Sequence, residues 1–567
     1  MMNEDAKPYQ TRKWVLLKHF NIVDGLTILG FALFSVIYFL GRWKGAYPFI
    51  FLGGDAANIA SFAAAWDHPK LFLGDQALGN PSNFRFYATI HIPILQALFR
   101  ITRDYGSAFI SLLAPHIFIQ TLGFYLFGRL VFQSRYWAIL LAIVTLAPVW
   151  LNLGEYWGIS PDPQPRFSFQ ALLPYILAAT FYWGQQPSSW PWLMAATGSL
   201  IYVHPVSTPG WGLAIWLGFL ALKPVYYSFK KQLAYMLMAG VVFLAVALPW
   251  LIHYLSNHAH GATANYKEIY ELMITYFGKG YLDIPWAIKE FILLMWQKGL
   301  LPFFTVSLPL ILWLRREDRQ TVLLVSLWLV GILITAIAIP MTEQVIARAY
   351  NLIPVQIDLV RGLRYVVPIL LLLCLWSLVE IAKKYGNTRI IAVIGALLVI
   401  LWAYQPKPDF VRTGLIFSEL LQCWRQGNLV CMNVADSRSL EALEAISRLT
   451  PPTSRILPLG EIAQAYSLAI RYYALRPVVY SYKDVGVLGY ANHAEFIKWH
   501  QKNHKMKKIE KEKNSQIQLQ EVKKLSQELG AQYCLVDNNL SLMTNSNLKG
   551  ENLIYKNQAL SLIKIIN

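Results

Sequence analysis

The sequence predicts a polytopic all-α membrane domain of about eleven transmembrane helices, followed by a small C-terminal α/β domain outside the cytoplasm. Of the 567 residues, 56% are hydrophobic and only 14% are charged, which is more apolar surface than a water-soluble chain of this size buries. The apolar residues gather in runs close to the roughly 20 residues that a helix needs to cross the hydrocarbon layer. Basic residues alternate between the connections, as in helices that cross a membrane in turn.

Eleven apolar runs carry the prediction of a membrane domain. Their limits are 22–40, 107–132, 136–153, 170–184, 191–206, 210–222, 233–255, 293–314, 320–340, 365–382 and 389–404. The short runs 191–206 and 210–222 equally fit a single broken hairpin. A further partial run at 88–100 is expected to be interfacial or re-entrant. Prolines within these runs are tolerated where neighbouring helices satisfy the freed carbonyl groups.

Basic residues set the predicted orientation. Lys7, Arg12, Lys13 and Lys18 precede the first run, so the N-terminus is expected to be cytoplasmic. Alternate connections carry Arg129 and Arg135; Lys223, Lys230 and Lys231; Arg315, Arg316 and Arg319; and Lys383, Lys384 and Arg389. Most of the net charge of +18 is therefore a topology signal, and no nucleic-acid partner is expected.

This orientation divides the chain into two domains. The membrane domain comprises residues 1–404, and residues 405–567 form the extracytoplasmic domain. The long connections on the outer side are expected at 42–106, 154–169, 256–292 and 341–364.

The first outer loop holds one acid in a distinctive context. Asp55 follows Gly53 and Gly54 directly and precedes an apolar stretch at 56–66, which is predicted to be a short helix at the membrane surface. Two interpretations of Asp55 stay open and are compatible, an N-cap for that helix and a functional carboxylate. Asp67, His68 and Asp75 are weaker candidates and fit ordinary solvated loop residues.

The second outer loop, "NLGEYWGISPDPQPRFSFQ", is stiffened by three prolines. Glu155 and Asp162 are acids beside the bilayer, suited to a metal ion or to general-base chemistry. Arg166 is suited to a phosphate. The alternative is a rigid connector with solvated charges.

Three arginines and a histidine mark the later outer loops. Arg348, Arg361 and Arg364 run against the positive-inside trend and indicate an anionic ligand at headgroup level, while snorkelling to lipid phosphates is the alternative. Arg361 and Arg364 are expected on one helix face. His204 ends an apolar run, where it is either a functional group or a neutral side chain bonded to a carbonyl.

The residues after 404 are more polar. "SRILPLG", "RPVVYSYKD", "AQYCLVD", "NLIYKN" and "LSLIKII" are predicted strands, and "IAQAYSLAIRYYA" is a predicted helix. The Lys-rich segment 498–528 is typical of a solvated helix, with contact to anionic lipid as the alternative. Cys423 and Cys431 either form a disulfide or are core residues. No nucleophile elbow, P-loop or HExxH motif is present, so the tail is expected to be structural or substrate-gripping.

The layout resembles that of the C-type (GT-C) membrane glycosyltransferases, which combine many helices, a long first outer loop with an acid after the first helix, and often an outer soluble tail. The segments "TPPTSRILPLG", "ALRPVVYSYKD", "LGAQYCLVD" and "LIYKN" are similar to tails of uncharacterised bacterial members. The resemblance implies a polyprenyl-phosphate sugar donor, inversion at the anomeric carbon and a place in the bacterial inner membrane. Asp55 matches the first-loop acid of the family. Glu155 and Asp162 fall in the loop where many members place a second acidic group.

The resemblance leaves two points open. Only "GGDA" follows the first helix, with no adjacent acidic pair, so the need for a divalent cation such as Mg or Mn is undecided. The predicted function is sugar transfer to a glycan, lipid or protein acceptor, with Asp55 as the base and Arg166, Arg348, Arg361 and Arg364 on the donor phosphate. The alternative is a transporter or flippase for a lipid-linked saccharide, which would more often show two similar halves. A non-catalytic scaffold gives no reason for acids and arginines to gather in outer loops.

Overall fold

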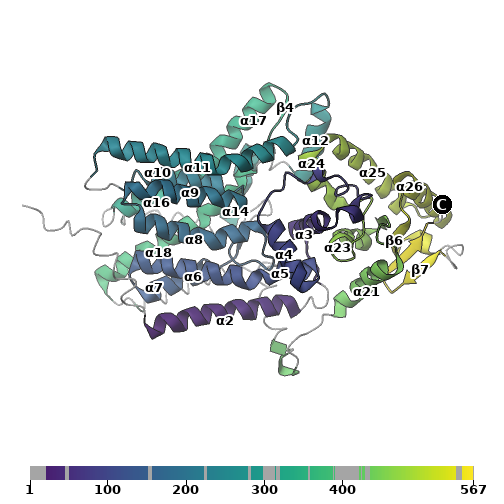
Figure 1. Cartoon of the computed structure of the whole chain (residues 1–567), viewed down its shortest axis with the longest axis horizontal. Coiled ribbons are helices and arrows are strands. Elements are labelled where there is room, and N and C mark those ends of the chain that lie inside the picture. Colours follow the sequence, from purple (N-terminus) through teal and green to yellow (C-terminus); the bar gives the residue numbers. More distant parts are fainter. Residues whose placement is uncertain are drawn as a thin grey trace, which may run out of the picture.

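The computed structural model describes residues 21–44, 50–150, 156–222, 227–278, 282–297, 313, 319–355, 358–386, 389, 421–422, 424–427, 434–544 and 552–565. The described chain is mostly helical, with a small sheet near its C-terminus. Long helices lie side by side in a bundle, and residues 434–565, hereafter the tail, cover one end of it (Figure 1).

The helices of the first half of the chain follow the predicted runs, except that α7 ends at Val144, nine residues before the end of the run 136–153. They are α2 (Ile22–Lys44), α3 (Gly54–Asp67), α4 (His91–Thr102), α5 (Tyr105–Ser111), α6 (Leu113–Phe132), α7 (Arg135–Val144), α8 (Pro165–Trp183), α9 (Trp190–Ser199), α10 (Thr208–Gly218) and α11 (Phe229–Asn257). The partial run at 88–100 corresponds to α4. The runs 191–206 and 210–222 form the two short helices α9 and α10, joined by the 3-10 turn η5 (Leu200–Tyr202) and the loop that contains His204.

The second half of the bundle contains α12 (Tyr266–Phe277), α14 (Ile284–Gln297), α16 (Arg319–Leu333), the π-helical turn η6 (Ile334–Ala338), α17 (Ile339–Ala349), the 3-10 helix η7 (Leu359–Tyr365) and α18 (Val366–Tyr385). Two short strand pairs lie in the connections between helices. β1 (Val149–Trp150) pairs with β2 (Tyr156–Trp157), and β3 (Gly261–Ala262) pairs with β4 (Leu352–Ile353), both antiparallel. The second pair holds the loop before η7 against the loop after α11.

Five segments among the described residues are long and apolar enough to cross a membrane, by length and composition. They are Ile22–Trp43, Tyr105–Phe132, Phe229–Asn257, Arg319–Ala349 and Leu359–Lys384. The prediction of about eleven crossings is thus not confirmed. The helices α7, α9 and α10 have 10, 10 and 11 residues, about half the length that a crossing needs. Most of the run 293–314 and nearly all of 389–404 lie outside the described residues.

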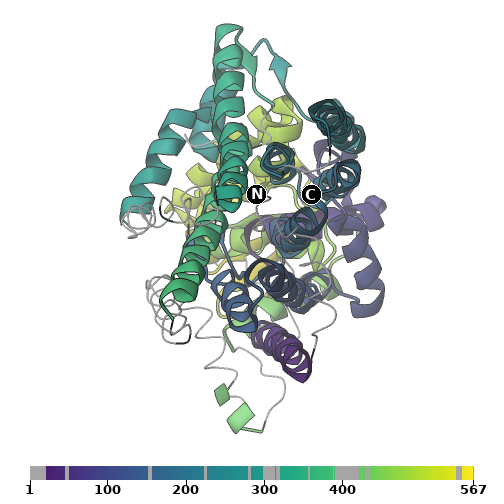
Figure 2. The same cartoon turned by 90° about the vertical axis from the view of Figure 1, so that its left-hand side faces the viewer.

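Small residues allow the bundle helices to pack closely. Figure 2 shows several of these helices end-on. At Gly331 of α16, a Cβ atom would lie 2.4 Å from the Cα of Ala214 in α10. At Gly123 of α6, it would lie 2.6 Å from the Pro174 ring of α8. Without a hydrophobic driving force between helices in lipid, such close backbone contacts are a main source of helix–helix affinity. Each of these glycines therefore fixes the separation of two neighbouring helices.

The helix predicted at 56–66 is present as α3, and protein covers most of it. Nine of its 14 residues are buried, and it packs against α4 and α5 and against α23 (Ser467–Tyr472) of the tail. Its alanines form one continuous hydrophobic core with Leu457, Ala469 and Leu535 of the tail. Burying apolar area against protein replaces the contact with lipid that the sequence suggested. The first outer loop and the tail consequently share one core.

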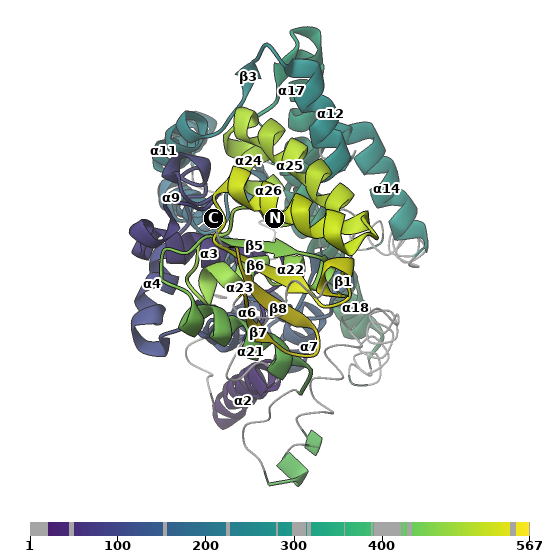
Figure 3. The same ribbon diagram turned by 90° about the vertical axis from the view of Figure 1, so that its right-hand side faces the viewer.

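The tail is built around a four-stranded sheet with the order β5-β6-β8-β7 (Figure 3). Its strands are β5 (Ile456–Leu459), β6 (Tyr533–Asp537), β7 (Leu553–Lys556) and β8 (Leu560–Lys564). β5 and β6 are parallel, and the other pairings are antiparallel. Its helices are α21 (Val434–Leu449), α22 (Glu461–Ala465), α23, α24 (Val485–Ala491), α25 (His493–Lys511) and α26 (Ser515–Leu529).

Most of the elements predicted for the tail are confirmed, and one is wrong. Four of the five predicted strands are present, the predicted helix at 462–474 is divided into α22 and α23, and the Lys-rich segment forms α25 and α26. The segment "RPVVYSYKD" is not a strand. It touches the sheet through an isolated bridge between Ile456 and Val478, and its last residues form a 3-10 turn capped by Ser481 and Asp484. Cys423 and Cys431 lie outside the described residues.

Candidate functional site

A cavity of about 400 Å³ lies where the membrane helices meet the first outer loop and the tail. We call it the Asp55 cavity. It is lined by residues of α3, the loop before α4, the start of α8, the loop between α9 and α10, the end of α11, the end of α12, η7 and the tail. The polar or charged members of the lining are Asp55, Asn58, Tyr87, Thr89, Gln164, Arg166, His204, Tyr254, Tyr276, Asp358, Arg361, Lys483 and Tyr490. Segments more than 400 residues apart in the sequence therefore meet at this cavity.

Asp55 lies in the first turn of α3, and its exposed side chain lines the cavity. The helix begins at the N-cap Gly53, and no side-chain cap hydrogen bond is present there. Gly54 has a φ of +53°, a left-handed conformation that costs glycine little. Of the two interpretations of Asp55, the N-cap is not supported, since Gly53 occupies that position. A carboxylate in the first turn is favoured by the helix dipole.

Arg166 lines the same cavity from the start of α8. Pro165 occupies the first helical position, where its missing N–H costs nothing, and this places Arg166 in the first turn. Its guanidinium carbon lies 5.3 Å from the centroid of the Phe167 ring. Burial raises the pKa of Tyr87 above its usual value, the charge of Asp55 raises it further, and that of Arg166 lowers it. The charges of both predicted site residues thus act on one half-buried phenol.

Arg361 reaches the cavity from η7, and a second carboxylate, Asp358, accompanies it. The guanidinium of Arg361 lies 3.8 Å from the Asp358 carboxylate, which also accepts a hydrogen bond of 3.0 Å from the Tyr490 hydroxyl of the tail. Asp358 has a φ of +56°, a conformation that aspartate tolerates better than most residues. The sequence-based prediction missed Asp358, although its position three residues before Arg361 was a usable signal.

His204 lines the cavity, and Arg364 contacts it through the hydroxyl of Ser207. The hydroxyl of Ser207 lies 2.7 Å from Nδ1 of His204 and accepts a 2.8 Å hydrogen bond from Arg364, which is 1% exposed. His204 lies outside the five candidate spans. Burial lowers its pKa well below the usual value, and the charges of Arg364, Arg166 and Arg361 lower it further. The imidazole of His204 is therefore neutral. Arg364 itself is not among the residues that line the cavity.

Asp162, one of the two acids predicted for a second acidic group, is not part of this site. Asp162 does not line the cavity and forms an ion pair of 3.1 Å with Arg42 of α2, and Arg42 also donates to the carbonyl of Phe51. Asp162 thus ties the second outer loop to the beginning of the first. Glu155 lies outside the described residues. Two of the three weak candidates are also engaged, because Asp67 accepts a hydrogen bond from Tyr105 and Asp75 is 5% exposed and bound to Arg471. The third, His68, packs its ring against Phe99 and Tyr105 and does not line the cavity.

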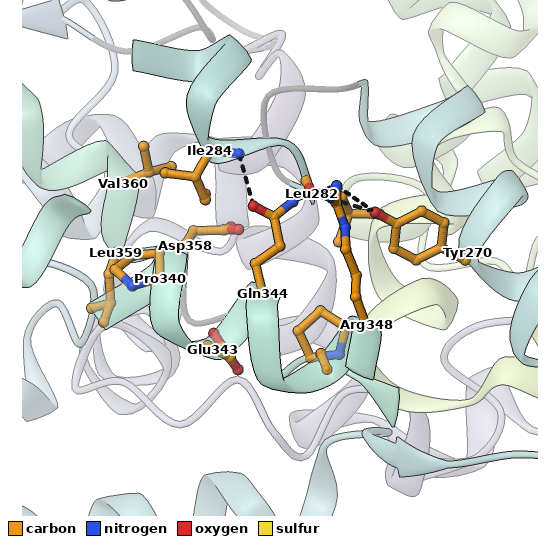
Figure 4. A pocket seen from close by; sticks show the side chains of 12 residues that line it. Tyr270, Leu282, Ile284, Pro340, Glu343, Gln344, Arg348, Asp358, Leu359 and Val360 are labelled. Atoms are coloured by element: carbon orange, nitrogen blue, oxygen red, sulfur yellow. Dashed lines mark hydrogen bonds between the residues drawn. The ribbon is translucent and has the colours of Figure 1, made fainter. Parts of the chain in front are cut away.

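Arg348 lies in a separate, smaller pocket of about 40 Å³, which we call the Arg348 pocket (Figure 4). Its guanidinium donates to the hydroxyl of Tyr270 at 3.3 Å and to the carbonyl of Leu282 at 3.4 Å. Gln344 beside it bridges the carbonyl of Leu282 and the amide of Ile284. Arg348 is thus separated from Arg166 and Arg361, with which the sequence-based prediction grouped it. Asp358 lines both spaces.

No protein-family model matches this chain. No curated protein matches it either. The chemistry of the site must therefore be derived from its own residues.

The donor set of the site does not by itself fit a metal ion. Among the residues that the structure describes, no group of three or more His, Cys, Asp or Glu side chains is placed to hold one. The Asp55 cavity does contain two carboxylates, two arginines, one lysine and a wall of aromatic rings. Such a lining suits a ligand with an anionic group and with a polar ring that stacks on aromatic faces.

Proposed function

We propose that the protein is a membrane glycosyltransferase that moves a sugar from a polyprenyl-phosphate donor to an acceptor, with inversion, at the face of the membrane where the tail lies. The observation that carries the proposal is the meeting of Asp55, Arg166 and Arg361 in one cavity of about 400 Å³ beside the membrane helices. A pocket of this size suits one sugar unit and its phosphate. The two arginines match the anionic phosphate of the donor, and the aromatic wall matches the sugar ring.

In the proposed reaction, an acceptor hydroxyl attacks the anomeric carbon from the face opposite the phosphate. The bond between that carbon and the acceptor oxygen forms, and the bond to the phosphate oxygen breaks. The electron pair leaves with the polyprenyl phosphate, whose growing charge Arg166 and Arg361 stabilise in the transition state. The hydroxyl proton passes to the carboxylate of Asp55, the general base. Neutral His204 donates a hydrogen bond to the sugar, or accepts one from it, without adding charge to the site.

The experiment is Asp55→Asn, assayed for sugar transfer in membranes with a panel of undecaprenyl-phosphate-linked hexoses and pentoses. Losing the base is expected to lower the rate by about 10²- to 10⁴-fold. Asp67→Asn is the matched control, because Asp67 ends the same helix but does not line the cavity. Its transfer rate is expected to stay within about threefold of the wild type. Normal transfer by a normally expressed Asp55→Asn protein would refute the catalytic role.

The transport alternative predicts a different outcome in the same system. A transporter for a lipid-linked saccharide moves its substrate intact, so the sugar stays on its polyprenyl phosphate while crossing the bilayer. Recovery of the labelled donor, unchanged but on the opposite leaflet, would support transport. Appearance of free polyprenyl phosphate together with a glycosylated acceptor would support transfer.

A further inference from the structure

The tail supplies a cation to the Asp55 cavity. Lys483 lines the cavity together with Val485, Val487 and Tyr490, although these residues follow Arg361 by more than 120 positions. Lys483 is the middle residue of a 3-10 turn, η8 (Tyr482–Asp484), at the point where the chain enters α24. The prediction of a strand over "RPVVYSYKD" concealed this turn. The tail is thus part of the cavity wall and not only a cover for the bundle.

The turn that carries Lys483 is held rigidly. It has a capping box, in which the hydroxyl of Ser481 accepts from the amide of Lys483 and a carboxylate oxygen of Asp484 accepts from the amide of Ser481 at 3.1 Å. The same hydroxyl lies 2.7 Å from that of Ser467, and the carbonyl of Ser481 accepts from the indole of Trp499 at 2.8 Å. All of these bonds except that of the Lys483 amide are buried, and a buried hydrogen bond fixes geometry more strictly than one exposed to water.

A buried ion cluster ties this turn to the first outer loop. Arg471 of α23 donates to Asp484 at 2.5 and 3.1 Å and to Asp75 at 2.8 Å through two nitrogens. Asp75 also accepts from the amide of Val478. Burial by itself would lower the pKa of Arg471, but the two carboxylates raise it above its usual value, so the guanidinium stays charged. Breaking such a cluster leaves a buried charge unpaired, and the loop and the tail therefore keep one relative position.

The charge of Lys483 is available to a ligand. Its side chain is half-buried, and its ammonium nitrogen lies 5.3 Å from the centroid of the Tyr482 ring. None of the ion pairs formed within the described ranges includes Lys483. A rigid turn that presents a cation to a cavity already containing Arg166 and Arg361 has the chemistry of a phosphate site, in which lysine acts as a point charge.

We infer that Lys483 binds the phosphate of an isoprenoid phosphate in the Asp55 cavity, so that the tail completes the anion site begun by Arg166 and Arg361. The inference rests on the proposed function for the identity of its ligand, and it assigns to the tail a direct role in binding. It predicts that the charge at position 483 governs affinity for the phosphate, independently of whether Asp55 acts as a base.

The experiment measures binding of farnesyl phosphate to the full-length protein in detergent micelles, with no acceptor present. Lys483→Gln is expected to weaken the affinity by about 10- to 100-fold, the usual loss for one charged hydrogen bond. Lys483→Arg keeps the charge and is expected to stay within about threefold. Lys498→Gln is the matched control, since Lys498 lies exposed on α25 of the same tail and pairs with Glu495. Thermal melts of all variants verify that the tail is folded.

Two further probes distinguish binding of the apolar chain from binding of the phosphate group. Farnesol tests the apolar chain alone, and inorganic phosphate tests the anion alone. We expect both to bind at least tenfold more weakly than farnesyl phosphate, and only inorganic phosphate to respond to Lys483→Gln. The inference is overturned if the wild type does not bind farnesyl phosphate, or if Lys483→Gln binds it within twofold of the wild type.

The outcome is independent of the test of function. A large effect of Lys483→Gln together with normal sugar transfer by Asp55→Asn would leave the binding role standing and refute the catalytic one. The reverse pair of results would refute the role of Lys483 and leave sugar transfer standing.

Discussion

The Asp55 cavity and the Arg348 pocket are two polar spaces that share Asp358. They differ in volume and in the segments that supply their charged residues. The cavity holds about 400 Å³ and collects charges from segments far apart in the chain, whereas the pocket holds about 40 Å³. In the pocket, Tyr270 and Leu282 already accept hydrogen bonds from Arg348. An arginine near the end of an apolar helix is therefore not by itself evidence of a ligand. The space beside it decides whether a ligand can reach it.

The largest effect is expected on the free energy of unfolding, when the ion cluster that holds the tail against the Asp55 cavity is broken. Arg471→Met leaves the buried carboxylates of Asp75 and Asp484 unpaired and is expected to cost about 3–5 kcal/mol of the free energy of unfolding. The measurement is denaturant unfolding of the detergent-solubilised protein. Lys523→Met, on the exposed face of α26, should change the same quantity by less than about 0.5 kcal/mol.

This first prediction distinguishes the two spaces, because no tail residue lines the Arg348 pocket and only the Asp55 cavity should change. Loss of the ion cluster should displace Lys483 and Tyr490 and leave Arg348 in place. An Arg471→Met protein as stable as the wild type would show that the tail is positioned by its apolar core alone.

The second prediction compares the two arginines directly. Arg361→Gln removes a cation from the wall of the Asp55 cavity and is expected to lower kcat/KM for sugar transfer by about 10²- to 10³-fold, as when one preorganised donor to a developing charge is lost. Arg348→Gln is the matched substitution in the Arg348 pocket and should stay within about threefold. Equal losses in the two variants would mean that both spaces contact the substrate, and the functional distinction between them would be wrong.

The smallest effect concerns pH and the aromatic wall of the Asp55 cavity. His258 packs against Phe86, Tyr254 and Tyr490 of that wall, and among the described residues neither of its ring nitrogens has a hydrogen-bond partner. Burial lowers the pKa of His258 to about 3 and that of His493 to about 4. Below about pH 6.5 the unfolded chain therefore takes up protons that the folded chain excludes.

Stability from these two histidines is complete above about pH 6.5 and falls as the pH is lowered towards their folded pKa values. The melting temperature is expected to fall between pH 7 and pH 5, and His258→Phe should reduce that slope because phenylalanine fits the aromatic wall without titrating. No histidine lines the Arg348 pocket, so Arg348→Gln should leave the slope unchanged. A slope identical in His258→Phe and wild type would contradict the assignment.

The sequence predicted the helices well, because apolar runs of the right length are a direct signal of them. It could not predict that α3 is covered by the tail, since an apolar face looks the same whether lipid or protein buries it. The number of crossings is not confirmed, because an apolar run of about 15 residues forms a short helix as readily as a membrane span, and only five described segments are long enough to cross. The strand predicted over "RPVVYSYKD" failed since its β-branched and aromatic residues were read without the capping box formed by Ser481 and Asp484.

The site was predicted in part. Asp55, Arg166, Arg361 and His204 were chosen from local context and line one cavity. Asp162 and Arg348 were chosen on the same grounds, but each is engaged by a partner, Arg42 or Tyr270, that is distant in sequence and carries no local signal. Lys483 was missed because a lysine in a basic tail carries no signal until the fold places it in the same cavity as Arg361. The charge of a residue can be read from the sequence, whereas the fold decides which charged residues come together in one cavity.

The central claim, that segments far apart in the chain form one site for an isoprenoid phosphate, is tested most directly by photo-crosslinking. A diazirine-bearing farnesyl phosphate is irradiated with the full-length protein, and the adducts are mapped by peptide mass spectrometry. We predict adducts within 55–62, 164–166, 358–361 and 483–490, all suppressed by excess unlabelled farnesyl phosphate. Suppressible adducts confined to other segments, such as those around Arg348, would contradict the claim.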